Sequence, residues 1–552
     1  MARARVLAAS RVLLFALALI PVLLPLAARS ATIHVPGDAP TIQAGIDAAA
    51  PGDSVLVAPG TYSGPGNTDL DFGGKDLVLR SEGGAAVTAI DLNHAGRGFF
   101  FTHRETGALL VDGFTVENGL VDSDGGAVLC NFSSPAFANC VFTGNAGDSG
   151  GAMWLYASSP VVTDCTFSGN FGGGNSEAAG HGGAIWADRY SSPTLTRCAF
   201  IDNSASRRGG AVWIGVGAPV LTDCTFTGNS TMSMGGGVMC YGGSSHAAFV
   251  RCTFSGNTTT SAGGGVACLY TSPSFTGCTF TGNVGGSRGG GMWLSGSFPT
   301  IDGCVFDRNS AVAGGGLLCF ASGPAIASST FHANGAGAGG GGGLYLGSLF
   351  GASTAVISRT IIASGPRGEA VLCEPGSSAV LSCADVFGNA GGDWVGCLAG
   401  QSGTNGNFSA DPLFCDAAGG DLTLDAGSPC APEHSPSGCD LVGALPVGCG
   451  TTAIASDAAP AAAGALRVVP NPLATGGVIR WVSERPGPAT LGLYDSLGRL
   501  VLARDLGATG AGRQEIAWER LAGASKLPAG VYFLRLEGGL GPARATRVVV
   551  TR

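Results

Sequence analysis

Five charged or titratable side chains lie in one glycine-rich insertion, FGGGNSEAAGHGG at residues 171–183, or within the repeat that follows it. These are Glu177, His181, Asp188, Arg207 and Arg208. Carboxylates can bind a cation, and imidazole or guanidinium groups can assist a proton transfer, so one hypothesis is a catalytic cleft. The alternative is that these charges are solvated beside an exposed turn. No second carboxylate is expected beside Asp188, because the neighbouring repeats carry Tyr156, Gly215 and Tyr241 at the same position.

Aromatic side chains recur at the fifth position of a repeated hexapeptide, which first occurs as GGAVLC at residues 125–130. The position holds four of the seven tryptophans and one tyrosine: Trp154, Trp186, Trp213, Trp293 and Tyr345. It is expected to point outward, so that the first three rings form a stripe about 10 Å long on consecutive repeats. Such a stripe suits the apolar faces of sugar rings. The alternative is that the rings cover glycine-rich backbone or pack under the insertion.

Three further motifs are interpreted as turns. Residues 147–151 spell GDSGG, the nucleophile motif of chymotrypsin-like proteases, but its last two glycines belong to the repeat, and a triad needs His and Asp held by a different fold. The segments DSDG at 122–125 and DLD at 69–71 offer oxygens to calcium. They fit neither a twelve-residue calcium loop nor the GGxGxD repeat. We therefore expect no cofactor, with calcium as the one alternative.

A repeat organises the region that carries these residues. The hexapeptide occurs nine times, and a second motif, C-x-F-x-x-N, follows most copies. The cysteines of the second motif lie at 140, 165, 198, 224, 252, 278 and 304. A recurring period of this length predicts a solenoid. The apolar runs are too short for helices and alternate in polarity, which predicts three short strands per repeat.

The predicted fold class is all-β, with a right-handed parallel β-helix followed by a small C-terminal antiparallel β-sandwich. The fourth and sixth hexapeptide positions, and the Cys and Phe of C-x-F, are expected to point inward. The Asn that closes each repeat is expected to tolerate a left-handed backbone and to bond the Asn above and below it.

Composition and the N-terminus indicate an exported protein. The net charge is −9, and the chain has two lysines, Lys75 and Lys526. Because the sequence shows no basic patch, a nucleic acid partner is not expected. Arginines followed by an apolar run at residues 12–26 predict a secretory signal peptide over residues 1–30. No other segment reads as a membrane span. We expect a secreted or surface-attached monomer.

The eighteen cysteines fall into two sets. Those at inward positions of the repeat are expected to be buried thiols, and those of the irregular tail to form disulfides. A spacing of ten residues leaves bridges across the lumen open for Cys130–Cys140, Cys268–Cys278 and Cys373–Cys383. No pair has zinc-finger spacing, so a metal–thiolate site is not expected.

The segment that follows the signal, ATIHVPGDAPTIQAGIDAAAPGDSVLVAPGTY, predicts a short helix after Pro40, with Ile42 and Ile46 on one face, that covers a sheet end. It resembles the N-terminal cap of secreted pectin lyase-like β-helix proteins, and GGAV…NCVFTGN resembles the repeats of polymorphic outer-membrane proteins. We assign residues 31–395 to this β-helix with its capping helix. For lyases of this fold, the resemblance implies outward carboxylates that hold calcium and an Arg or Lys that acts as the base.

The repeat decays after Cys383. We predict a cysteine-rich cap over residues 396–450, an Ala/Thr-rich linker over 451–465 and an immunoglobulin-like β-sandwich over 466–552. The sandwich carries four short markers: NP at 471–472, YD at 494–495, GR at 498–499 and PAGVYF at 528–533. They resemble the C-terminal sorting domain of type IX secretion cargo and the immunoglobulin-like domain of flagellar hook-capping proteins. The resemblance implies an export or attachment module, with the export machinery as a partner.

Two functions from different classes follow. The first is a non-enzymatic adhesin or scaffold that binds a polysaccharide or cell-surface glycan. The second is a polysaccharide lyase or glycoside hydrolase whose site lies on the same tryptophan-lined face. The regularity of the repeats favours the first, because active sites usually break local rules and one repeat departs strongly from the others.

Overall fold

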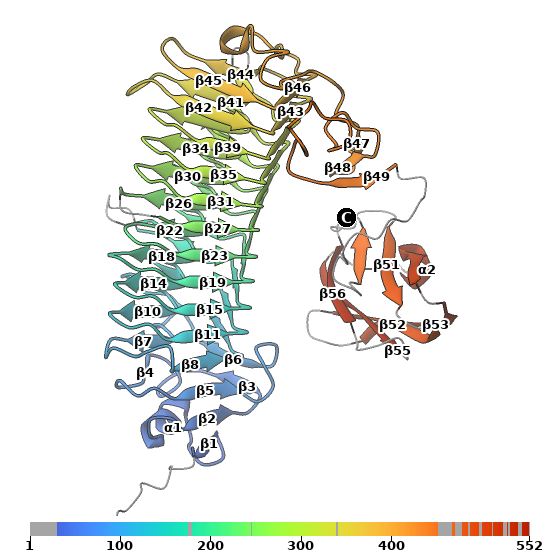
Figure 1. Ribbon diagram of the computed structural model, residues 1–552. Coiled ribbons are helices and arrows are strands. Elements are labelled where there is room, and N and C mark those ends of the chain that lie inside the picture. The colour runs from blue at the N-terminus through green and yellow to red at the C-terminus, as the bar shows by residue number, and fades with distance from the viewer. Residues whose placement is uncertain are drawn as a thin grey trace, which may run out of the picture.

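The computed structural model describes two parts of the chain, residues 30–450 and 466–550, apart from short gaps (Figure 1). The gaps in the first part are residues 175–178, 244–245 and 338–339. Those in the second part are residues 470–476, 484–485, 496–499, 511, 523–526, 528–529 and 539–543. Residues 1–29 of the predicted signal peptide, the predicted linker and Glu177 lie outside the described residues.

Residues 32–387 wind into a parallel β-helix in which four sheets run along its length (Figure 1). Within the described residues, sheet 1 has 14 strands from β1 (Thr32–Val35) to β45 (Ser378–Ser382), and sheet 2 has 12 strands from β4 (Leu70–Asp71) to β44 (Glu369–Cys373). Sheet 3 has 13 strands from β3 (Gly60–Tyr62) to β46 (Asp385–Phe387), and sheet 4 has seven strands from β13 (Ala146–Gly147) to β37 (Ser310–Ala313).

One coil shows how the motifs become strands. It consists of β14 (Met153–Tyr156) in sheet 2, β15 (Val161–Thr163) in sheet 1, β16 (Thr166–Ser168) in sheet 3 and β17 (Phe171–Gly172) in sheet 4. Strand β14 pairs in register with β10 (Val128–Asn131) and β18 (Ile185–Asp188). The predicted β-helix and its three strands per coil are confirmed. The fourth strand was not predicted, because a two-residue strand has no periodicity to detect.

The interior is filled by identical positions of successive coils. All nine residues at the fourth hexapeptide position and all nine at the sixth are at most 2% exposed, so both are inward as predicted. The phenylalanines of C-x-F stack with ring centroids 4.5–5.0 Å apart through eight coils: Phe142, Phe167, Phe200, Phe226, Phe254, Phe280, Phe306 and Phe331. Each unit therefore buries its apolar side against its neighbours.

The asparagines form the predicted ladder. Asn203 donates from N and Nδ2 to Oδ1 of Asn229, both at 3.0 Å, and Asn229 donates likewise to Oδ1 of Asn257 at 3.0 and 2.9 Å. The left-handed residue, however, is the one before the Asn, such as Gly228 with φ 66°. The expectation that the Asn itself adopts this conformation was therefore wrong. Its role is to satisfy buried backbone and amide groups from coil to coil.

Two disulfides join the end of the β-helix to its cap, and a third lies within the cap. They are Cys373–Cys397, Cys383–Cys439 and Cys415–Cys449. The other twelve cysteines are buried thiols. Eleven of them lie in the repeat, as expected, whereas Cys430 of the tail is also a thiol, and Cys373 and Cys383 of the last coils pair with cysteines of the cap. The three bridges suggested by ten-residue spacing were wrong, because equivalent cysteines stack along the coil axis and each inward thiol faces apolar neighbours.

The N-terminal end is covered by the predicted helix α1 (Ile42–Ala48). Thr41 caps it by accepting a hydrogen bond from Ala44 N, and Ile42 and Ile46 are fully buried. Among the described residues, no helix has the length and apolar character needed to cross a bilayer.

The C-terminal cap contains a small sheet of β47 (Phe414–Asp416), β48 (Asp421–Asp425) and β49 (Val447–Cys449). It packs on the last coils through an apolar cluster that includes Ile361, Leu424 and Val442. Asp385 of β46 is fully buried beneath it, where it accepts hydrogen bonds from Ala410 N (3.0 Å) and the Cys430 thiol (3.3 Å). Burial raises the pKa of Asp385 to about 7, and the nearby carboxylates Asp393 and Asp411 act in the same direction.

Asp385 is expected to make the cap less stable as the pH rises. An unfolded aspartate titrates near pH 4, so the stability that comes from the folded protonated form is fully present below that pH and is lost as the pH rises through about 7. We expect the free energy of unfolding to fall by about 3 kcal/mol between pH 5 and pH 8 from this group, and Asp385→Asn to remove that dependence. Denaturant unfolding at both pH values measures it, with the exposed Asp440→Asn as control. A pH dependence that is the same in the wild type and Asp385→Asn would contradict the assignment.

The C-terminal module has two antiparallel sheets. One contains β50 (Arg467–Val469), β51 (Val478–Ser483) and β54 (Gly512–Ala517), and the other contains β53 (Leu500–Thr509), β52 (Gly487–Asp495), β55 (Gly530–Gly538) and β56 (Arg544–Val550). A short helix, α2 (Trp518–Ala522), follows β54. Ile479, Trp481, Leu491 and Leu534 belong to one buried core. The predicted β-sandwich is thus confirmed, whereas the markers at 471–472, 498–499 and 528–529 lie outside the described residues.

Candidate functional site

The tryptophan stack consists of Trp154, Trp186 and Trp213 on the outer side of sheet 2. Their strands β14, β18 and β22 (Val212–Ile214) are consecutive and in register, so the three residues lie directly beside one another (Figure 1). The ring centroids are 5.3 and 5.4 Å apart, and both pairs are within 5° of parallel. Tyr156 extends the stack at Trp154, with a centroid distance of 5.3 Å. The parallel-sheet register therefore converts a sequence repeat into a continuous aromatic surface.

The five aromatic residues at the fifth position are not equally open. Trp154, Trp186 and Tyr345 are partly exposed, but Trp213 is 7% and Trp293 is 5% exposed. His181, from the inserted loop, stacks on Trp213 with a centroid distance of 5.6 Å. Trp293 packs with Leu318 and other apolar neighbours. The alternative that the rings pack under neighbouring residues therefore describes these two, because His181 covers Trp213 and the apolar side chains of adjacent coils cover Trp293.

Exposed rings lie in several turns after sheet 2, and the sequence analysis did not single them out. Phe132, Tyr190 and Tyr270 are 60%, 76% and 59% exposed. Each has a positive φ, at 54°, 68° and 55°. A bulky residue in this conformation is strained, and such strain is found most often at functional sites. An aromatic residue in a polar turn is the sequence signal that could have identified them.

Among the described residues, the charged side chains at and after the insertion lie in different environments. Oδ1 of Asp188 accepts hydrogen bonds from Arg189 N (2.7 Å) and Val216 N (2.9 Å), so this carboxylate stabilises a turn. The residue paired with Asp188 in the register of the preceding coil is Tyr156, as predicted. His181 is 5% exposed, and its backbone bridges to Arg208 on the adjacent coil. Arg207 lies next to Arg208, and both are partly buried. The structure therefore brings His181 and the two arginines together near Trp213, and leaves Asp188 in a separate role.

The acidic turn at residues 122–125 is held by an arginine. Arg97 is 7% exposed and donates to Gly125 O (3.0 Å), Asp124 O (2.9 Å) and Ser123 Oγ (3.0 Å). Burial raises the pKa of Asp124, and Asp148 adds to the effect. A guanidinium thus occupies the carbonyl oxygens of this turn, which supports the turn interpretation over a calcium loop. The serine of GDSGG, Ser149, is 1% exposed and also belongs to a turn.

Tyr345 lies in a separate pocket of about 660 Å³, several coils from the tryptophan stack. Its hydroxyl donates to Glu374 Oε1 at 2.5 Å, and Ser348 donates to Glu374 Oε2 from N (2.6 Å) and Oγ (2.8 Å). Burial, followed by the bond to Glu374, raises the pKa of Tyr345 to about 12, and the same bond lowers the pKa of Glu374. The Arg288 guanidinium lies 5.2 Å from the centre of the Phe320 ring at the same pocket. An arginine beside aromatic rings can contact an anionic or a sugar group.

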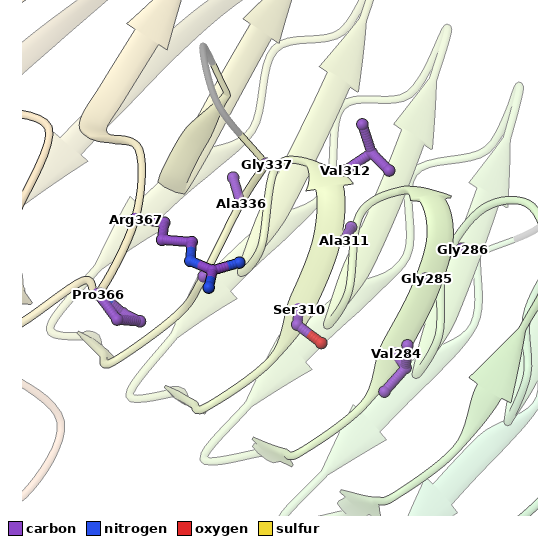
Figure 2. Close-up of a pocket in the computed structure, with 11 residues that line it drawn as sticks. Val284, Gly285, Gly286, Ser310, Ala311, Val312, Ala336, Gly337, Pro366 and Arg367 are labelled. Carbon is purple, nitrogen blue, oxygen red and sulfur yellow. The ribbon is translucent and has the colours of Figure 1, made fainter.

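A groove of about 510 Å³ runs beside the C-terminal end of sheet 4 (Figure 2). Four successive coils line it with residues 284–286, 310–312, 335–337 and 366–367. Its labelled polar side chains are Ser310 and Arg367, and the others are glycine, alanine, valine and proline (Figure 2). Since binding sites need several converging polar groups for orientation, we assign no ligand to this groove.

Comparisons with known proteins identify the fold family. A mannuronic acid specific polysaccharide family 6 lyase from human gut microbiota is 14% identical, with a TM-score of 0.35 and coverage of 69% of this chain and 90% of that chain. The A-module of the Azotobacter vinelandii mannuronan C-5 epimerase AlgE4 is 14% identical, with a TM-score of 0.31 and coverage of 61% of this chain and 94% of that chain. Pectate lyase Pel9A is 13% identical, with a TM-score of 0.34 and coverage of 76% of this chain and 97% of that chain. No curated protein sequence matches the chain. The family model of the right handed beta helix region matches residues 78–254 and 236–408, so the chain belongs to the right-handed β-helix family.

Proposed function

We propose that the protein is a non-enzymatic glycan-binding protein, an adhesin or surface scaffold, whose ligand is a polysaccharide or cell-surface glycan. The parallel stack of Trp154, Trp186 and Trp213, spaced by 5.3 and 5.4 Å, is the observation that carries the proposal. Because the three rings cover one another's faces, they present their outer edges, which together with the open rings Phe132 and Tyr190 form an apolar surface for the C–H groups of sugar rings. A ligand enters from the side of Trp154 and Trp186, because Trp213 is covered.

The alternative of a lyase or hydrolase has less support. Glycoside hydrolysis uses two carboxylates that flank the scissile bond, and a lyase needs a free base beside the sugar. Asp188 accepts two backbone hydrogen bonds, and Tyr156 is paired with it in the register of the preceding coil. Arg207 and Arg208 keep the alternative testable, because both are partly exposed and lie beside His181.

We also propose that the chain acts outside the cytoplasm, as a monomer, and reaches that location through its C-terminal module. Support comes from three disulfides, which are typical of oxidising compartments, and from the sandwich fold of the module. Deletion of the residues after 465 is expected to keep the β-helix inside the producing cell, as fractionation would measure.

A binding assay on a glycan array tests the main proposal. The chain from residue 31 is expected to bind a subset of polysaccharides without releasing products from them. Product release is followed by the absorbance of unsaturated sugars and by reducing ends. Appearance of either product would overturn the non-enzymatic assignment. Absence of binding to every glycan would instead leave the tryptophan stack as packing.

A further inference from the structure

The described chain contains one group of at least three side chains whose ligand atoms suit a metal ion, at the N-terminal end of the β-helix. It consists of Asp71, His103 and Glu105, with all ligand atoms within 4.8 Å of one another. We propose that this group binds a divalent first-row transition metal ion, such as Zn²⁺. The site is distinct from the tryptophan stack, and the proposal does not depend on glycan binding.

The distances fit such an ion. His103 Nδ1 lies 3.4 Å from Asp71 Oδ1 and 3.9 Å from Glu105 Oε1. Ligands bound to Zn²⁺ at about 2.1 Å in a tetrahedron are roughly 3.4 Å apart, so the distance between His103 and Asp71 already fits, and a contraction on the order of 1 Å closes a set whose atoms all lie within 4.8 Å of one another. One imidazole and two carboxylates match the ligand preferences of Zn²⁺ and of related borderline ions. Asp71 and His103 are about half exposed, which leaves a path from solvent and a position for water.

Glu105 contributes a buried negative charge to the group. Its side chain is fully buried, and its one ion pair in the described part of the chain is the 3.9 Å contact with His103. A buried carboxylate is costly unless a cation or several donors stabilise it. Hydrogen bonds from Gly74 N, His103 N and Ser133 Oγ supply part of this, at 3.2, 3.0 and 2.8 Å. A bound dication would neutralise both Glu105 and Asp71.

The surrounding residues hold the ligands in place. Oε2 of Glu105 receives the His103 and Ser133 donors, so Oε1 is the oxygen turned toward the imidazole. Arg104 has φ 64°, which turns the chain between the two ligands, and its N donates to Ser133 Oγ at 3.0 Å. Outer hydrogen bonds of this kind orient metal ligands. Because Asp71 ends strand β4 and the other two ligands follow β7 (Phe99–Phe101), the metal would join two successive coils where sheet 2 begins.

Titration of the chain from residue 31 with Co²⁺, a coloured substitute for Zn²⁺, tests the site. We expect one equivalent to bind, with a ligand-field band and no thiolate charge-transfer band, and to raise the unfolding temperature. His103→Ala is expected to weaken binding at least tenfold. The control is His34→Ala, because His34 pairs with one carboxylate, Glu82, at 3.6 Å and similar exposure but lacks a second.

Three outcomes would overturn the proposal. One is no Co²⁺ binding by the wild type at millimolar concentration, and another is binding that His103→Ala leaves unchanged. The third is a thiolate charge-transfer band, which would place the ion on cysteines. If His103→Ala fails to fold, Asp71→Asn serves instead, because its side chain is 46% exposed and the substitution keeps its shape.

Discussion

Alanine at Trp186 is expected to lower the affinity for the glycan ligand by about thirtyfold. Trp186 is the middle ring of the tryptophan stack, in parallel contact with Trp154 on one side and Trp213 on the other. Its loss removes the central contact surface and leaves the outer rings without lateral support. Central aromatic contacts of binding sites typically contribute about 2 kcal/mol, which corresponds to this factor. Affinity for the best ligand of the array, measured by calorimetry, checks the value.

Trp293→Ala is the matched control, because Trp293 occupies the same hexapeptide position on a distant coil and is buried. It is expected to lower stability but not affinity. Trp186→Phe keeps an aromatic surface and is expected to recover part of the binding. If Trp186→Ala binds as tightly as the wild type, the tryptophan stack is packing and the proposed function is wrong at this site.

Alanine at Asn229 is expected to give the largest loss of stability in the β-helix, roughly 3–5 kcal/mol. Asn229 is fully buried, and its amide takes part in four hydrogen bonds, which join Asn203, Asn257 and Phe200 O. Removal of the amide leaves the N and Nδ2 donors of Asn203 without this acceptor. It also leaves the acceptors Phe200 O and Asn257 Oδ1 without this donor. A buried polar group without a partner destabilises the fold by more than its hydrogen bond stabilises it. The denaturation midpoint of the β-helix in guanidinium chloride measures the loss.

Thr227→Ala is the control for this substitution, since Thr227 is exposed on β24 (Thr225–Thr227) of the same coil. Its effect is expected to stay within about 0.5 kcal/mol. A similar midpoint for both variants would mean that the asparagine ladder contributes specificity of winding but little stability.

Local periodicity was enough to predict much of the architecture. Alternation within GGAVLC put its fourth and sixth positions inside, and the recurrence of C-x-F-x-x-N predicted both the phenylalanine column and the asparagine ladder. These predictions succeeded because a solenoid makes each residue's environment depend on its own repeat and the next. The same reasoning missed sheet 4, whose strands are too short to show a period, and it misplaced the left-handed residue by one position.

The sequence by itself determined the solenoid, its inward columns and the alignment of the three tryptophans. Only the tertiary structure decided which rings stay open, because the side chain of His181, just before one hexapeptide, stacks on Trp213 of the next coil. It also decided that Asp188 stabilises a turn and that Cys383 pairs with Cys439, 56 residues away. The meeting of Asp71 with His103 and Glu105 and the burial of Asp385 under the cap depend likewise on contacts between coils and cap. Periodicity encodes the contacts that repeat, whereas contacts that occur once are set by the path of the folded chain.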